Sequence, residues 1–326
     1  MYGPDFTFLG IERCDLDKPE TYKDADVVIV GAPIDSGTSH RSGAKFGPQA
    51  IRMGDYLPHD GERPHLALRT DGLKDMKVVD AGDLLMNGGN LEESLALLAA
   101  ATEKISRAGA IAVILGGDHS IASADVAGIA NHRGKGKISM VHFDAHADTG
   151  TDQWGALVGH GTPMRRLIEN GHVRGDRFLQ LGLRGYWPDD ATLNWMRDQG
   201  MRSYEMTEIH HRGLKAVLDE SFATLTDGCD GVFLSVDIDV VDPGMAPGTG
   251  TPEPGGMTSR ELLEAVRRIC LELPVVGVDI VEVAPPFDSA DITAILANRV
   301  VLEALSAIAL RKKGGSYSPT RNLLDR

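Results

Sequence analysis

Cysteine is scarce in this sequence, with three residues in 326, and this scarcity excludes two kinds of site. Cys14, Cys229 and Cys270 lie far apart, and none belongs to a CxxC pair. A disulfide framework or a thiolate metal site needs cysteines at paired, short spacings. The sequence therefore predicts free, buried thiols.

Long apolar runs and basic charge are also lacking. No apolar run approaches the roughly 18 residues of a membrane span, and the N-terminus MYGPDFTFLGIERCD carries acids where a targeting peptide is basic. Basic residues number 33 against 47 acidic ones, for a net charge of −14. Such a charge repels nucleic acid and anionic membranes, and it either attracts a small cation or serves solubility alone. We expect a soluble, cytoplasmic protein without nucleic-acid or membrane partners.

What the sequence does contain is an alternation of short β-branched runs with longer amphipathic segments. Helical periodicity marks 91–109 and 259–273. Strands are predicted at 25–33, 77–83, 110–118, 137–148, 177–185, 231–243 and 274–286. Continuous apolar strands between helices are typical of a parallel sheet covered on both faces. The expected fold class is α/β, a single-domain three-layer α/β/α arrangement with a mostly parallel central sheet.

Nothing in the sequence divides this pattern into separate parts, because it has no repeat, low-complexity tract or long polar linker. We expect one domain over residues 25–312, with an N-terminal arm at 1–24 and a polar C-terminal tail at 313–326. The tail is suited to oligomer contacts or to fraying.

Four of the predicted strands end in polar, mostly acidic clusters. These are GGDHS (116–120), DAHAD (144–148), DIDVVD (237–242) and DIVEVAPPFD (279–288). Ligands of such sheets bind beyond the carboxyl ends of the strands. Carboxylates gathered at the edge of an apolar core repel one another unless a cation neutralises them. The clusters therefore indicate a cation site at this edge.

Two of these clusters carry metal-ligating side chains at alternate positions. Alternate residues of an extended chain share a face, so Asp144, His146 and Asp148 are expected to converge. Asp237 and Asp239 are expected to converge in the same way. Each motif alone also fits a solvated strand end, but their combination favours metal.

Two further histidines accompany these motifs. With His119, the set reaches four carboxylates and two imidazoles, which suit a pair of divalent ions such as Mn²⁺. His142 shares a face with Asp144 but lies deeper in the apolar run SMVHF. We expect His142 to be a core histidine with a satisfied hydrogen bond.

The order and separation of GGDHS, DAHAD and SVDIDVVDP, with the loop APGTGTPEPGG, resemble the ureohydrolase family of arginases and agmatinases. The likeness extends upstream to GAPIDSGTSHRSGAKFGPQAIR and downstream to GVDIVEVAPPFD, over roughly residues 28–310. Within the family, the chain looks closer to agmatinase, guanidinobutyrase and proclavaminate amidinohydrolase than to true arginases. The resemblance implies an arginase-like fold and hydrolysis of a guanidinium group to urea, or a urea analogue, and an amine.

The resemblance also implies roles for individual residues. It implies two metal ions, Mn²⁺ or with the same ligands Ni²⁺, held by His119, Asp144, His146, Asp148, Asp237 and Asp239. Asp144 and Asp237 would bridge the two ions. His160, in GHGTP, matches the family's proton-shuttle histidine, and Asp148 would assist it. Glu282, in DIVEVAP, matches the carboxylate that pairs with the guanidinium; from the residues alone, His160 and Glu282 have no assigned role.

The substrate's tail is less well defined. Family members that bind an α-amino acid do so with polar groups in the loop after DAHAD, which here reads TGTDQWGALVGHG (149–161) and has few such groups. We therefore expect a small cationic guanidino compound rather than arginine, with agmatine, guanidino acids, guanidine and biguanides unranked. Gln153 and Trp154 are the candidate contacts. Trp154 suits either a cap over the substrate or a packing anchor between subunits.

The resemblance implies a homo-oligomer, a trimer or a hexamer, and leaves open a hetero-oligomer with a homologous subunit. A catalytically silent subunit is one alternative, although every ligand position, His160 and Glu282 are intact. A formimino-group hydrolase of the same fold is another, because it needs the same nucleophile. A deacetylase-like enzyme ranks lower, because those relatives use one zinc ion and lack the full ligand set.

Overall fold

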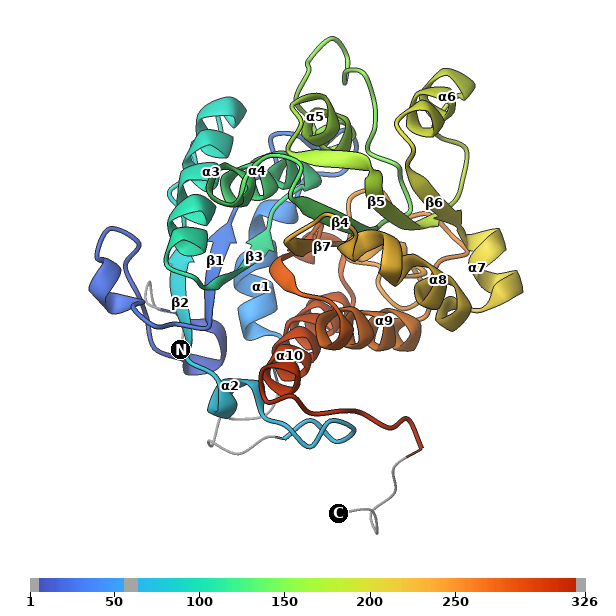
Figure 1. Ribbon diagram of the computed structural model, residues 1–326. Coiled ribbons are helices and arrows are strands. Elements are labelled where there is room, and N and C mark those ends of the chain that lie inside the picture. Colours follow the sequence, from blue (N-terminus) through green and yellow to red (C-terminus); the bar gives the residue numbers. More distant parts are fainter. Residues whose placement is uncertain (1–5, 56–63, 321–326) are drawn as a thin grey trace.

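A computed structural model describes residues 6–55 and 64–320 of the chain. Residues 1–5 of the expected N-terminal arm and 321–326 of the expected tail lie outside the described residues. The described chain forms an eight-stranded sheet in the order β2-β1-β3-β8-β7-β4-β5-β6, and every neighbouring pair is parallel. Figure 1 shows this sheet crossing the molecule from β2 to β6. The α/β class with a parallel sheet is confirmed.

All seven predicted strands form, and the structure adds one. The strands are β1 Val27–Ala32, β2 Val78–Asp83, β3 Ile111–Gly116, β4 Ile138–Phe143, β5 Val173–Leu183, β6 Arg202–Glu205, β7 Gly231–Asp237 and β8 Val275–Val281. The unpredicted strand β6, RSYE, lies at the edge of the sheet and has a single buried residue. An edge strand this short and polar lacks the apolar run by which the inner strands were recognised.

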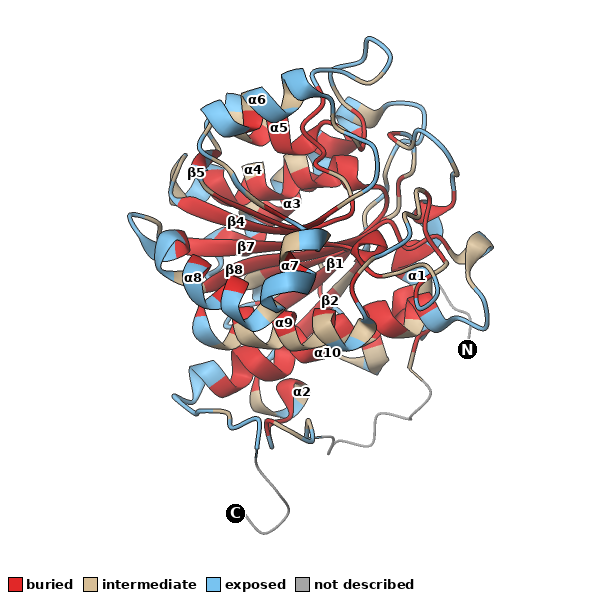
Figure 2. Ribbon diagram, turned by 90° about the vertical axis from the view of Figure 1, so that its right-hand side faces the viewer, coloured by how far each residue is buried: buried red, intermediate tan, exposed pale blue. Residues whose placement is uncertain are grey.

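Helices cover both faces of the sheet, which explains why the inner strands are buried along their whole length (Figure 2). One face carries α3 Leu91–Arg107, α4 Ala122–Arg133 and α5 Pro163–Glu169. The other carries α8 Leu214–Thr226, α9 Ser259–Glu272 and α10 Ile292–Lys312. The remaining α-helices of the described chain are α1 Gly47–Met53, α2 Gly72–Asp75, α6 Asp190–Asp198 and α7 Met206–Arg212.

The two helices predicted from periodicity begin at identifiable caps. Asn90 caps α3 by accepting a hydrogen bond from the amide of Glu93 at 3.1 Å. Thr258 and Glu261 form a reciprocal capping box at the start of α9. The buried residues of α9 recur every three or four positions, as an amphipathic helix requires: Leu262, Ala265, Val266, Ile269 and Cys270.

Helix α10 is a core helix. Of the helices in the described residues, it alone is long and apolar enough to cross a membrane, and 78% of the qualifying window is buried inside the fold. The expectation that no apolar stretch approaches this length was wrong, because the helix stays apolar on average despite Arg299 and Glu303. Glu303 accepts hydrogen bonds from Arg267 on α9, so the charge is paired where the two helices pack.

Candidate metal centre and active site

The predicted polar clusters meet at the carboxyl ends of β3, β8, β7 and β4, which are consecutive neighbours in the sheet. His119 starts a short 3-10 turn after β3, and Asp118 caps that turn by accepting from Ser120 N at 3.0 Å. Asp237 is the last residue of β7 and Glu282 directly follows β8. Strand order therefore brings together side chains that are more than a hundred residues apart.

Three carboxylates surround one nitrogen of His119. Its Nδ1 lies 3.1 Å from Asp144 Oδ2, 3.0 Å from Asp148 Oδ2 and 3.2 Å from Asp237 Oδ2. All four side chains are buried. Despite this proximity, Nδ1 makes no hydrogen bond to any residue that the structure describes.

The other ring nitrogen of His119 explains this. Its Nε2 lies 2.9 Å from Ser235 Oγ, and the Ser235 hydroxyl donates to Asp279 Oδ1 at 2.8 Å. Because that hydroxyl proton goes to Asp279, Ser235 Oγ accepts from Nε2–H. The lone pair of His119 is then on Nδ1 and faces the carboxylates, which is the arrangement of a metal ligand held by outer hydrogen bonds. The donor set fits a divalent cation.

A second group of ligating atoms adjoins the first. His146 Nδ1 lies 3.1 Å from Asp239 Oδ2 and 3.3 Å from Asp144 Oδ1. Asp144 thus directs one oxygen to each imidazole, as a bridging carboxylate does. Asp237 Oδ2 faces the first group, and its Oδ1 accepts from the amide of Asp239 at 2.9 Å.

His142 also lies within reach of the first group, but its nitrogens are engaged. Gln180 Nε2 donates to His142 Nδ1 at 3.1 Å, so Nε2 carries the proton and donates to Asp144 Oδ2 at 2.8 Å. The prediction of a core histidine with satisfied hydrogen bonds is confirmed. Its hydrogen bond orients Asp144.

The close approach of charged groups shifts the pKa values of the side chains in the cluster. Burial raises the pKa of Asp237 well above its ordinary value, and the carboxylates of Asp239 and Asp144 add to this effect. Burial lowers the pKa of His119, but the surrounding carboxylates outweigh it and hold the pKa well above its usual value. Protons can offset part of this negative charge, and divalent cations would offset it more fully.

The ligating residues converge for a different reason than expected. Strand β4 ends at Phe143, so Asp144, His146 and Asp148 belong to the following loop and not to an extended strand. Asp148 has a φ of 52°, in the left-handed region that non-glycine residues seldom adopt. The expectation that strand alternation would align these side chains was wrong, because the turn at Asp148 directs its carboxylate to His119. Glu282, with a φ of 62°, has the same uncommon conformation.

His160 and Glu282 meet beside the cluster. His160 Nδ1 lies 2.9 Å from Glu282 Oε1, which also accepts from His119 N at 2.9 Å. Glu282 is 1% exposed, and its Oε2 has no hydrogen-bond partner in the described part of the chain. Burial lowers the pKa of His160, but Glu282, Asp148 and Asp118 outweigh it and raise the pKa to about 9.

A cavity of about 360 Å³ opens next to these residues. His146, Asp148, Asp237 and His160 form its inner end, and Ser39, Trp154, Trp187 and Thr251 are among its walls. The sequence analysis missed Ser39, Trp187 and Thr251. Trp187 lies two residues beyond the predicted strand segment 177–185, so the strand-end rule could have found it. Ser39 and Thr251 lie in the segments GAPIDSGTSHRSGAKFGPQAIR and APGTGTPEPGG, whose resemblance to the family was the signal that could have found them.

Both predicted contacts of the loop after β4 line this cavity, in different ways. Gln153 donates from Nε2 to Gly37 O at 2.8 Å and accepts at Oε1 from Gly161 N at 3.2 Å. Its amide therefore holds two loops together. The Trp154 side chain is free to make new contacts, because the residue is 81% exposed.

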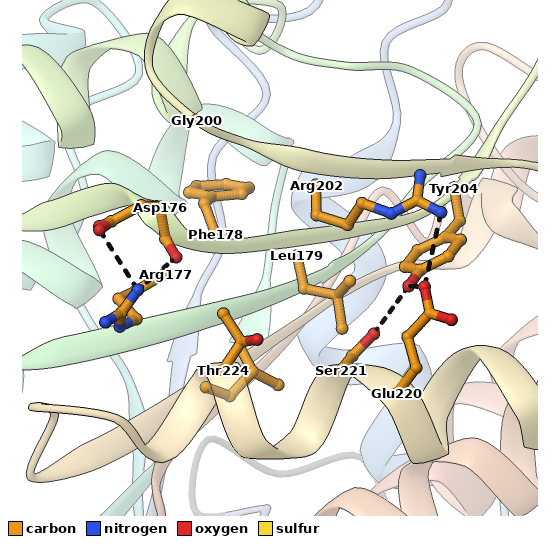
Figure 3. Close-up of a pocket in the computed structure, with 11 residues that line it drawn as sticks. Asp176, Arg177, Phe178, Leu179, Gly200, Arg202, Tyr204, Glu220, Ser221 and Thr224 are labelled. Carbon is orange, nitrogen blue, oxygen red and sulfur yellow. Dashed lines mark hydrogen bonds and ion pairs between the residues drawn. The ribbon is translucent and has the colours of Figure 1, made fainter.

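A separate hollow of about 280 Å³ lies between β5, β6 and α8 (Figure 3). Arg202 stacks 3.6 Å from the centre of the Tyr204 ring, and the Tyr204 hydroxyl donates to Glu220. At the other side of the hollow, Arg177 forms an ion pair with Asp227. None of the predicted site residues lines this hollow, and its charged groups are paired with one another. These paired side chains stabilise the edge of the sheet.

Comparisons with known proteins agree with this fold. Residues 25–307 match the model of the Arginase family. The guanidinobutyrase of Pseudomonas aeruginosa is 37% identical over 286 residues, which cover 87% of this chain and 86% of that protein. The solved proclavaminate amidinohydrolase of Streptomyces clavuligerus is 34% identical with a TM-score of 0.84, over 95% of this chain and 99% of that one. The formiminoglutamase of Trypanosoma cruzi, solved with Mn²⁺, is 25% identical with a TM-score of 0.80, over 88% and 95%.

Proposed function

The chain belongs to the arginase family as a metal-dependent ureohydrolase, and from this premise we propose that it hydrolyses a small guanidino compound other than arginine. The products are urea, or a urea analogue, and an amine. One observation carries the proposal: the lone pair of His119 Nδ1 faces three carboxylates, one of which also reaches His146. A cation site of this composition, beside a cavity with a proton-carrying histidine, suits hydrolysis of a resonance-stabilised carbon.

Two divalent ions are proposed for this centre. Mn²⁺ is the first choice, because a solved relative contains it, and Ni²⁺ suits the same oxygen and nitrogen donors. The proposed ligands are His119, Asp144, His146, Asp148, Asp237 and Asp239. When bound, such ions supply a hydroxide nucleophile near neutral pH and neutralise the carboxylates.

The remaining chemistry falls to His160 and Glu282. A guanidinium loses its amine only when the departing nitrogen takes a proton, and His160 is the proposed source of that proton. Glu282 Oε1 accepts from Nδ1–H of His160 and stabilises the cationic imidazole. Glu282 is the proposed partner of the guanidinium, and this is supported by its Oε2, which has no hydrogen-bond partner among the described residues.

The charge of the cavity supports a substrate without a carboxylate. Among the described residues that line it, none is lysine or arginine, whereas Asp152 adds negative charge near the mouth. The nearby Arg41 donates to the backbone carbonyls of Thr249 and Gly250. Agmatine, simple alkylguanidines and guanidine therefore suit this wall better than a guanidino acid, whose carboxylate would meet no cation.

A urea-release assay tests both parts of this proposal. Agmatine, 4-guanidinobutyrate and butylguanidine differ mainly in the charge at the end of similar carbon chains, and arginine and guanidine complete the series. We expect urea from agmatine or butylguanidine at a kcat/KM about tenfold or more above that of 4-guanidinobutyrate, with Mn²⁺ or Ni²⁺ loaded. Preference for the guanidino acid would overturn the argument from cavity charge. Urea from none of the series with either metal would overturn the ureohydrolase proposal.

A formimino-group hydrolase is the second candidate, supported by the likeness to formiminoglutamase. It would release formamide instead of urea, so product analysis on formimino substrates separates the two activities. A silent subunit would bind metal and turn over neither class of substrate alone.

Trp154→Ala tests whether the loop after β4 covers the substrate. We propose that the exposed indole stacks on the guanidinium or on the substrate's tail. The variant should raise KM by about tenfold and alter the ranking of guanidino substrates, because roughly 1–2 kcal/mol of stacking is lost. Metal content and subunit assembly should stay unchanged, as should all parameters in Leu157→Ala, an exposed apolar residue of the same loop.

The alternative role predicts a different result. If Trp154 is a packing anchor between subunits, Trp154→Ala would dissociate the assembly or lower its melting temperature. Substrate ranking would then be unchanged in the molecules that stay assembled. Size-exclusion chromatography and thermal melting, run beside the kinetics, distinguish the two roles.

A further inference from the structure

The hydroxyl of Ser39 lies beside His160 on the wall of the cavity. Ser39 is exposed and lines the cavity, whereas His160 is 8% exposed. Ser39 Oγ lies 2.6 Å from His160 Nε2. We propose that Ser39 is a further catalytic residue of this site, which passes the proton from His160 to the leaving amine. This inference rests on the proposed function.

The hydrogen bonds of His160 determine which nitrogen exchanges the proton. Nδ1–H donates to Glu282 Oε1, whose other hydrogen bond comes from the backbone amide of His119. Glu282 Oε1 therefore acts as an acceptor and keeps a proton on Nδ1. Nε2 is left to gain and lose a proton, and its hydrogen-bond partners in the described chain are the amide and the hydroxyl of Ser39.

Ser39 offers a partner to both forms of the imidazole. When His160 is neutral, Nε2 accepts from the Ser39 backbone amide at 3.0 Å. When His160 is cationic, the proton on Nε2 cannot face that amide and is directed to Ser39 Oγ, which accepts it. The first atom to receive the shuttle proton is thus the serine oxygen, and not an atom of the substrate.

The proposed relay conserves protons and electrons. As Nε2–H of His160 breaks, a new O–H bond forms on Ser39 Oγ. The original Ser39 O–H breaks in the same step, and its proton forms an N–H bond on the amine that leaves the substrate. Ser39 is neutral before and after the step, and His160 changes from cation to neutral imidazole.

Charged groups from three strand ends face His160 and favour its cationic form. They are Glu282 after β8, Asp148 after β4 and Asp118 after β3, and against the opposing effect of burial they raise the pKa of His160 to about 9. The proton that His160 holds has its route outward through the hydroxyl of Ser39, 2.6 Å from Nε2.

The loop that carries Ser39 is held firmly in place. Gly37 N donates to Asp118 Oδ2 at 2.7 Å, and Gly37 O accepts from His160 N at 3.0 Å and from Gln153 Nε2 at 2.8 Å. Two residues before Ser39, the backbone is thus bound to the loop of the shuttle histidine itself. These hydrogen bonds hold the backbone that positions Ser39 Oγ beside His160.

Ser39→Ala is a sharp test, because it removes the hydroxyl but keeps the backbone hydrogen bond to Nε2. His160 should stay in place, held by that amide and by Glu282. We expect kcat to fall by roughly tenfold to a hundredfold, the scale of an impaired proton transfer, with KM and metal content unchanged. Ser39→Thr, which keeps a hydroxyl, should recover most of the loss. Ser36→Ala is the matched control. Ser36 lies in the same loop as Ser39, but its hydroxyl donates to Gly88 O and not to His160.

Two readouts separate a relay from a merely structural role. The solvent deuterium isotope effect on kcat should increase in Ser39→Ala, because proton transfer becomes slower than the other steps. In the metal-free protein, nitrogen NMR of the imidazole should show Nε2 of His160 shifted by Ser39→Ala and unmoved by Ser36→Ala.

Each outcome decides the question. A kcat within about twofold of the parent protein, an equal loss in Ser39→Ala and Ser39→Thr, or an unchanged isotope effect would overturn the relay, since proton donors are worth more than that. If the parent protein releases no urea, the proposed function fails as a whole. The NMR measurement then decides separately whether Ser39 and His160 are hydrogen bonded, and an unmoved Nε2 resonance would overturn that contact.

Discussion

Asp144→Asn is expected to remove most of the bound metal and to reduce turnover below detection, while the sheet stays folded. Asp144 directs Oδ2 to His119 Nδ1 at 3.1 Å and Oδ1 to His146 Nδ1 at 3.3 Å, so both proposed ions depend on it. The amide side chain has nearly the same shape but offers one neutral oxygen in place of two that share a negative charge. Two cations would then be under-neutralised in a buried site, which is strongly unfavourable.

The fold should survive this change, because the asparagine oxygen can still accept from Nε2–H of His142. Metal analysis of the purified variant, circular dichroism and the urea assay test the three parts of the expectation. Asp83→Asn is the control: Asp83 also ends a strand, but it pairs with Arg52 outside the cluster. Asp144→Asn protein that keeps two ions per chain and full activity would refute the assignment of a shared ligand.

His160→Ala is expected to lower kcat by roughly a hundredfold or more, with metal content unchanged. The reason is that His160 holds a proton next to the cavity, whereas its nitrogens bond to Glu282 and Ser39 and not to a proposed ligand. His211→Ala, at an exposed position of α7, is the control and should leave both quantities unchanged. If His160→Ala instead loses metal, then His160 is itself a ligand.

The pH profile gives a second measure of the same residue. A proton donor is active only while it is protonated, so turnover should decline as the pH rises through the pKa of His160, which is raised to about 9. Glu282→Gln removes the anionic partner that contributes most to this rise, and the pKa should fall towards the ordinary value of about 6.5. The alkaline limb of the kcat profile should therefore move to lower pH. An unmoved limb would show that another group controls it.

Much of the fold follows from local pattern. The inner strands were recognisable because helices on both faces bury every position, so that apolar residues predominate, as in ISMVHF of β4. The edge strand β6 was not, because solvent on one side allows RSYE to be polar. Helix α10 shows the same dependence on context, since its composition alone would also suit a membrane.

The sequence predicted the site to a similar extent as it predicted the fold. Acids and imidazoles at the ends of apolar strands indicated a cation centre, and the resemblance to ureohydrolases added His160 and Glu282. The route by which Asp144, His146 and Asp148 converge was not predictable, because it depends on a left-handed turn at Asp148 that the letters DAHAD do not specify. The contact between Glu282 Oε1 and His160 Nδ1, at 2.9 Å, was not predictable from the letters DIVEVAP either.

By itself, the sequence determined which residue types stand at which strand ends, because burial and strand period act on neighbouring residues. Only the tertiary structure decided which atoms meet. Ser235 and Asp279, which determine that the lone pair of His119 is on Nδ1, lie more than a hundred residues after it in the sequence. Ser39 and His160, whose side chains are hydrogen bonded, are 121 residues apart. Such contacts depend on the strand order β3-β8-β7-β4 and on the backbone angles of single loop residues. Neither is encoded in a local pattern, and hydrogen bonds and metal ligation depend on distances of a few tenths of an ångström.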